Sequence, residues 1–145
     1  MNNEAKILYY RKLFKSLQED IVFLKILLSK IGDAYKSERE NIYRLLNAYI
    51  EEKNRASILL AQLNEEIIGD EEINKSVYEE YLQNKNIPLL CKYIYEHYTE
   101  DLLKIRDILN TLDKENNIIS ENFVRLTPIE RMSLYQVNMD FNGSK

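Results

Sequence analysis

Apolar residues recur at alternating spacings of three and four through the first thirty residues of the chain. This spacing is that of one face of an α-helix, and it continues over four heptads. Leu8, Leu13, Phe23 and Leu27 lie off this seam, so the apolar face is wider than a two-stranded coiled coil needs. We predict a helix over residues 4–31 that contacts more than one neighbour. The seam consists of Ile7, Tyr10, Phe14, Leu17, Ile21, Leu24, Leu28 and Ile31.

A second helix is predicted from about residue 34 to 68. The same spacing runs from Ile42 to Ile67 and is interrupted only at Lys53. Gly32 and Asp33 separate the two helices, and we expect Gly32 to supply a left-handed C-terminal cap. Because the connection is so short, the two helices must fold back on each other as an antiparallel hairpin.

The sequence after the hairpin contains start signals for three further helices. Asp70, after Gly69, is a good N-cap for a third helix, whose inward residues we predict to be Ile73, Val77, Tyr81 and Leu82. Pro88 is expected to open a fourth helix at its first position, and Asn116-Asn117 to close it. Thr127-Pro128-Ile129-Glu130 reads as a capping box that starts a short last helix.

The predicted fold is therefore all-α, a bundle of about five helices built on a long antiparallel hairpin. We expect one domain over residues 1–137 and a flexible C-terminal tail over residues 138–145. Only three glycines and two prolines occur in 145 residues, which leaves little material for the tight turns of an all-β fold. The longest apolar cluster, residues 21–28, is interrupted by Lys25 and too short to span a bilayer. With no signal-peptide pattern at the N-terminus, we predict a cytoplasmic protein without a membrane partner.

Charge is distributed unevenly along the chain. The net charge is −4, but residues 1–30 carry +3, residues 31–86 carry −5 and residues 87–145 carry −2. The overall sign argues against binding dominated by nucleic-acid phosphates. The eleven tyrosines suit core packing first and a protein interface second.

Catalytic and metal-binding patterns are missing from the sequence. Cys91, the single cysteine, and His97, the single histidine, are six residues apart and would point to opposite sides of a helix. No Glu-x-x-Glu, Glu-x-x-Asp, Asp-x-x-Glu or Glu-x-x-His pair offers two ligands to one metal ion. No glycine-rich phosphate loop occurs either. We therefore predict no catalytic residue, no metal, no cofactor and no small-molecule ligand.

Two stretches near the C-terminus resemble a known family. Residues 101–109 read Asp-Leu-Leu-Lys-Ile-Arg-Asp-Ile-Leu, and residues 126–135 read Leu-Thr-Pro-Ile-Glu-Arg-Met-Ser-Leu-Tyr. Together they resemble the end of the α-helical domain of archaeal GINS subunits. Asp107-Ile108 departs from the family's Lys-Ile, Ile129-Glu130 stands where two acids are expected, and the family's small β-rich domain is missing. The resemblance implies a non-catalytic DNA-replication scaffold that joins the MCM helicase to a RecJ-like partner.

Other proteins are the expected partners, in a homo- or hetero-oligomer. The resemblance further implies that Arg106 holds a carboxylate at a packed interface. One alternative is a small helical adaptor or regulatory protein of a virus or mobile element that dimerises through its N-terminal hairpin. Another is a nucleic-acid-binding bundle that uses Lys6, Arg11, Lys12, Lys15, Lys25 and Lys30. The predicted interface residues are Leu8, Arg11, Lys12, Lys15, Phe23, Leu27, Tyr93, Tyr95, Arg106 and Tyr135.

The wide apolar face of the first helix generates a prediction about assembly. Large exposed apolar patches are uncommon on soluble monomers, so we expect a second copy or another subunit to pack against residues 8–28. Sedimentation equilibrium at micromolar concentration should therefore show a mass above the 17.3 kDa of one chain. A clean monomer that copurifies with nothing and exposes no apolar patch would refute the prediction.

Overall fold

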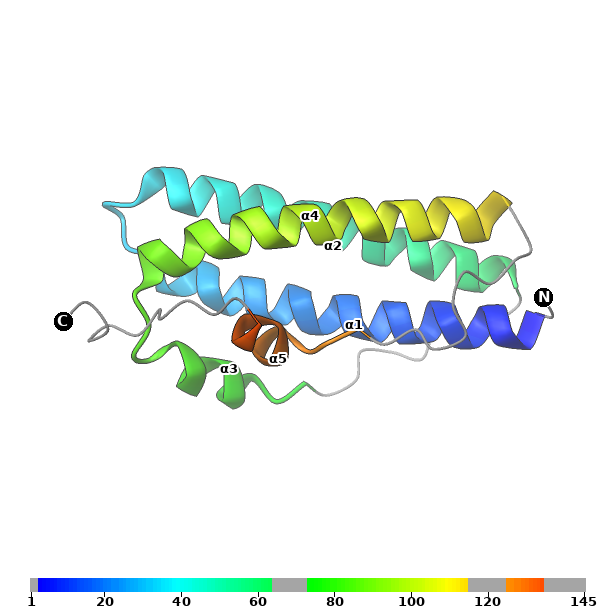
Figure 1. Cartoon of the computed structure of the whole chain (residues 1–145), viewed down its shortest axis with the longest axis horizontal. Helices are drawn as coiled ribbons and strands as arrows, with labels where there is room; N and C mark the ends of the chain where they lie inside the picture. The colour runs from blue at the N-terminus through cyan, green and yellow to red at the C-terminus, as the bar shows by residue number, and fades with distance from the viewer. Residues whose placement is uncertain (1–2, 64–72, 115–124, 135–145) are drawn as a thin grey trace.

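The computed structural model describes residues 3–63, 73–114 and 125–134. Within these ranges the chain forms five helices and no strand, which confirms the predicted all-α bundle. Three long helices lie side by side, while two short ones pack along α1 away from the layer that α2 and α4 form (Figure 1). The helices are α1 (Asn3–Lys30), α2 (Lys36–Gln62), α3 (Lys75–Leu82), α4 (Ile87–Lys114) and α5 (Pro128–Ser133).

The antiparallel α1–α2 hairpin is confirmed, but its turn is capped differently from the prediction. Gly32 does not adopt the left-handed conformation that we expected of it. The turn instead closes through the amide of Tyr35, which donates to the carbonyl oxygen of Gly32 at 3.0 Å. Arg39 Nη2 then donates to the carbonyl oxygen of Ile31 at 2.5 Å and to Asp33 Oδ1 at 3.2 Å. A side chain from α2 therefore satisfies the carbonyl end of α1.

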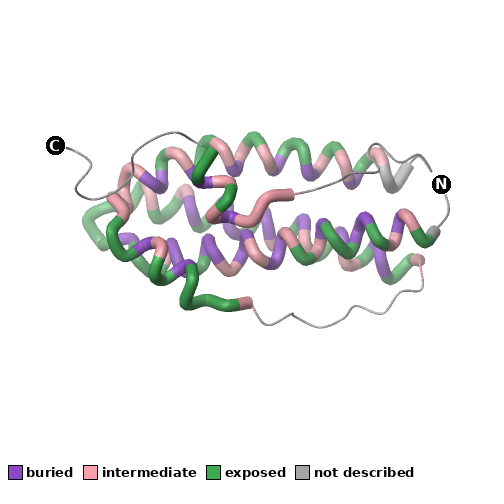
Figure 2. Tube along the Cα trace, turned by 60° about the horizontal axis from the view of Figure 1, so that its bottom comes forward, coloured by how far each residue is buried: buried purple, intermediate pink, exposed green. Residues whose placement is uncertain are grey.

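The centre of the bundle is α1, which contacts each of the other four helices. Its wide apolar face is covered by more than one neighbour, as we predicted. Figure 2 shows buried positions where the helices face one another. Phe23 and Leu27 are both 0% exposed, so the expected apolar patch over them does not exist. The Phe23 ring lies 5.5 Å from that of Tyr78 in α3 and 6.4 Å from that of Tyr98 in α4.

The inward residues predicted for α3 agree with the structure at Ile73, Tyr81 and Leu82 but not at Val77. Asn74 is its N-cap, and its side chain accepts a hydrogen bond from the amide of Ser76. Tyr78 and Leu82 are buried, whereas Val77 is 43% exposed. The prediction that Val77 points inward is wrong, because the contact between Tyr78 and Phe23 turns the helix so that Tyr78 faces the core. Asp70, the predicted cap, lies outside the described residues. Helix α2 ends at Gln62 with Leu63 as its C-cap, earlier than the predicted end at about residue 68.

The ends of α4 and α5 agree with the sequence to within a residue where the structure describes them. Pro128 is the first residue of α5, and Thr127 and Glu130 form the complete capping box. Pro88 is the second residue of α4 instead of the first, because the helix begins at Ile87. The predicted end at Asn116-Asn117, Tyr135 and the tail 138–145 all lie outside the described residues.

The packing of Phe23 generates a stability prediction. Phe23→Ala should lower the free energy of unfolding by about 3–5 kcal/mol, because it removes a ring that α3 and α4 enclose and leaves a cavity. Leu103→Ala is the control, since Leu103 is 61% exposed and should change stability by less than about 0.5 kcal/mol. Urea denaturation measures both variants. Equal effects would show that α3 does not seal Phe23 into the core.

Candidate functional site

One exposed face of α1 carries four of the predicted interface residues. Leu8, Arg11, Lys12 and Lys15 are all exposed, and Leu8 is 55% exposed. Their spacing of three and four places them on one side of the helix. The same spacing continues through Gln18, Val22, Lys25, Ile26 and Ser29 toward the C-terminal end of α1. Gln18 and Ile26 on this strip are buried, and we refer to the nine residues together as the α1 face.

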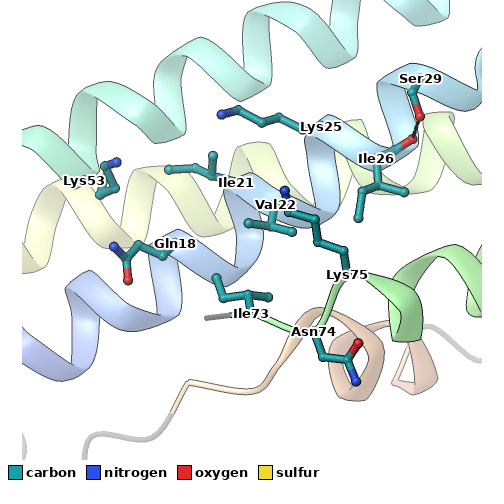
Figure 3. A pocket seen from close by; sticks show the side chains of 10 residues that line it. All are labelled: Gln18, Ile21, Val22, Lys25, Ile26, Ser29, Lys53, Ile73, Asn74 and Lys75. Carbon is teal, nitrogen blue, oxygen red and sulfur yellow. Dashed lines mark hydrogen bonds between the residues drawn. The ribbon is translucent and has the colours of Figure 1, made fainter. Parts of the chain in front are cut away.

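A groove of about 1100 Å³ follows the C-terminal part of the α1 face (Figure 3). We call it the α1 groove. One wall is α1, the second is Lys53 of α2, and the third is the chain that enters α3. Its lining residues are Gln18, Ile21, Val22, Lys25, Ile26, Ser29, Lys53, Ile73, Asn74 and Lys75.

The α1 groove combines an apolar surface with positive charge. Ile21 and Ile26 are buried, while Val22 and Ile73 are half-buried, so isoleucine and valine side chains form its apolar part. Lys25, Lys53 and Lys75 come from three different parts of the chain, and Figure 3 shows their amino groups at separate positions around the apolar side chains. None of the described residues that line the groove is acidic. The groove is therefore suited to a ligand that is both apolar and anionic.

The other predicted interface residues lie away from this groove. Tyr93, Tyr95 and Arg106 belong to α4, and none of them lines the α1 groove. Tyr93 is half-buried and stacks on His97, with ring centroids 6.4 Å apart. Arg106 does hold a carboxylate, because its Nε lies 3.6 Å from Glu52 Oε1, but that carboxylate belongs to α2 of the same chain.

A buried ion cluster, which we did not predict from the sequence, holds the segment that leads into α5. Asp20 of α1 is fully buried and lies 3.1 Å from Arg125 Nη2 and 3.3 Å from Arg131 Nη1. Asp101 of α4 contacts the same two arginines, with its Oδ2 paired to Arg125 Nη2 and 3.5 Å from Arg131 Nη1. Two carboxylates and two guanidiniums thus meet without a net charge. Arg125 also donates to Ser16 Oγ at 2.8 Å.

Two tyrosines complete the cluster. Tyr49 of α2 donates its hydroxyl to the carbonyl oxygen of Tyr98 at 2.8 Å and lies 3.0 Å from Asp101 Oδ2. Tyr98 donates to Asp20 Oδ1 at 3.3 Å, and the Arg131 guanidinium lies 4.9 Å from the centre of its ring. The cluster therefore connects α1, α2, α4 and the α5 segment through polar contacts inside the bundle.

Burial and the neighbouring charges shift the pKa values of these groups in opposite directions. Burial raises the pKa of the Asp20 carboxyl, and the neighbouring guanidiniums of Arg125 and Arg131 oppose that rise. Burial alone would lower the pKa of Arg131, but the carboxylate of Asp20 and the phenol oxygen of Tyr98 raise that pKa above its usual value. The Tyr49 hydroxyl has its pKa raised well above 10, first by burial and then by Asp101. These are the shifts of a desolvated structural network.

The single cysteine is enclosed in the core. Cys91 is buried, and burial raises the pKa of its thiol to about 12, so it is a neutral thiol near pH 7. Over the ranges that the structure describes, no three His, Cys, Asp or Glu side chains gather where they could hold a metal ion. Over the same ranges no helix has the length and apolar character needed to cross a membrane.

Comparison with known proteins found no matching protein-family model, no matching curated protein and no matching solved structure.

The ion cluster generates a prediction with a matched control. Asp20→Ala should lower the free energy of unfolding by about 3–5 kcal/mol, because two buried guanidiniums would then face one carboxylate. Glu40→Ala removes an exposed carboxylate that lies 2.7 Å from Arg44 and should cost less than about 1 kcal/mol. Thermal and urea unfolding give both values. A loss at Asp20 no larger than that at Glu40 would contradict a stabilising role for the cluster.

Proposed function

We propose that the protein is a non-catalytic scaffold that binds another protein through the α1 face. The observation that carries this proposal is the α1 groove, in which apolar side chains at the edge of the core are bordered by lysines. Protein interfaces commonly have an apolar centre with a polar rim. Leu8, with Arg11, Lys12 and Lys15 beside it, extends the same arrangement toward the N-terminus of α1.

A replication scaffold of the GINS type is the specific form of this proposal that the sequence favours. The support is the resemblance carried by residues 101–109 and 126–135. In the fold these two stretches touch, because Asp101 pairs with Arg131. The alternative, an adaptor of a virus or mobile element that dimerises through the α1–α2 hairpin, uses the same surface with a different partner.

Nucleic acid is a less favoured ligand for the α1 face. Lys6 and Lys30, which would form part of its phosphate contacts, are poorly available to a phosphate group. Lys6 is only 9% exposed, and Lys30 Nζ lies 3.2 Å from Glu79 Oε2. Apolar side chains also interrupt the remaining basic positions. A nucleic-acid ligand would show a steep fall in affinity with increasing salt, which a titration of duplex DNA measures.

Affinity capture from the native host tests the proposal with matched variants. The variant Leu8→Glu, Lys12→Glu, Lys15→Glu alters the α1 face, and Leu103→Glu, Lys92→Glu, Lys104→Glu makes the same changes at exposed positions of α4. We expect wild type and the α4 variant to retain the same protein, and the α1-face variant to lose it by at least about tenfold, since interface charges of the wrong sign cost several kcal/mol.

The identity of the retained protein separates the two forms of the proposal. Helicase or other replication proteins would support the GINS-type scaffold, whereas a second copy of this chain would support the dimerising adaptor. Equal retention by wild type and both variants would contradict a binding role for the α1 face.

A further inference from the structure

We propose that the ligand of the α1 groove is an amphipathic helix of about three turns whose polar positions are acidic, supplied by a partner protein. This inference rests on the proposed function and specifies the chemistry of the partner. It follows from three properties of the groove: its length along α1, its apolar surface and the placement of its lysines.

The length of the groove matches a short helix. Its α1 residues run from Gln18 to Ser29 at positions i, i+3, i+4, i+7, i+8 and i+11, which is one continuous strip of the helix surface. At about 1.5 Å per residue this strip is roughly 16 Å long. A partner helix of about eleven residues, or three turns, has the same length.

The apolar side chains of the groove are placed to receive the apolar face of such a helix. Val22 and Ile26 come from α1, and Ile73 faces them from the chain entering α3 (Figure 3). An amphipathic helix lying in an apolar groove inserts residues at i, i+3, i+4 and i+7. The partner helix would then stand beside α1 as an additional member of the bundle.

The three lysines determine the charge of the partner. Lys25, Lys53 and Lys75 present their amino groups at separate positions, and no acidic residue lines the described groove. A ligand with a single anionic headgroup reaches one such position at a time. A helix with Glu or Asp on both sides of its apolar stripe presents carboxylates to all three, and the positive potential speeds its association.

Defined peptides test this proposal in solution. The probe is a fluorescein-labelled, hydrocarbon-stapled helix of about three turns, with Leu on one face and Glu elsewhere. A second peptide replaces every Glu by Lys, and a third has the composition of the first in an order without an apolar face. Fluorescence anisotropy with the full chain should show the acidic amphipathic peptide binding at least about tenfold more tightly than either control.

Matched variants of the full chain locate the binding site. Lys25→Glu, Lys53→Glu, Lys75→Glu should weaken binding of the acidic peptide by at least about tenfold. Lys36→Glu, Lys92→Glu, Lys104→Glu changes the net charge equally at exposed positions outside the groove and should leave the affinity within about twofold. Circular dichroism establishes that both variants are folded.

Several results would overturn the proposal. These are equal affinity for the acidic and lysine peptides, equal loss of binding in both variants, or binding to phosphatidylserine vesicles without binding to the peptide. The segment 64–72 of this chain itself contains five acidic residues. If the acidic peptide binds only after those five are changed to Asn and Gln, the groove serves the chain's own segment and the proposal fails.

The proposed function fails separately from this inference. If affinity capture depends on the α1 face but the acidic peptide does not bind, the scaffold proposal stands and only the chemistry assigned to the partner is wrong. If neither protein capture nor peptide binding depends on residues of α1, both proposals are wrong.

Discussion

The structure depends on burial of the wide apolar face of α1. A helix with apolar residues on more than one stripe cannot be covered by a single neighbour, and α1 contacts all four of the other helices described. The hairpin with α2 covers one side, α4 covers another, and α3 and α5 close the rest. On α1, Leu8, Arg11, Lys12 and Lys15 stay exposed, and the α1 groove lies beside the core, between α1, Lys53 of α2 and the chain that enters α3.

The ion cluster shows how the small α5 segment is held on this bundle. A six-residue helix has little apolar surface of its own, although Pro128 and Met132 are buried. Arg125 and Arg131 reach from this segment to carboxylates on α1 and α4, so ionic contacts add to that burial. Desolvation makes the formation of such a network costly in free energy, and removal of one charged partner costs far more because it leaves the other charge buried without its partner. The two positions of Asp20 and Asp101 therefore fix where the segment lies.

Long helices were predictable because they depend on local spacing, whereas the contacts between them depend on distant residues. The seam of α1, the hairpin and the Thr127–Glu130 capping box follow from patterns within a few residues. We did not predict the burial of Phe23, because it depends on the ring of Tyr78 in α3. The prediction that Val77 points inward was wrong for the same reason.

Polar parts of the core and of the candidate site were less predictable still. Asp20 stands inside the apolar pattern of the first helix, between Leu17 and Ile21, and a carboxylate at such a position is a sequence signal for a buried partner. Its arginine partners are more than one hundred residues away and Tyr98 is 78 residues away, so spacing alone cannot identify them. The exposed positions of Leu8, Arg11, Lys12 and Lys15 agree with the predicted face, while the α1 groove needs Lys53 and Ile73 from other parts of the chain.

The central claim is that the α1 groove is a binding surface for an acidic amphipathic helix. Methyl NMR of the full chain, labelled at Ile, Leu and Val and titrated with the acidic stapled peptide, observes that surface directly. We expect the signals of Val22, Ile26 and Ile73 to shift in a saturable manner while those of Leu103, exposed on α4, stay in place. Shifts at Leu103 without shifts at Val22 and Ile73 would place binding elsewhere and contradict the claim.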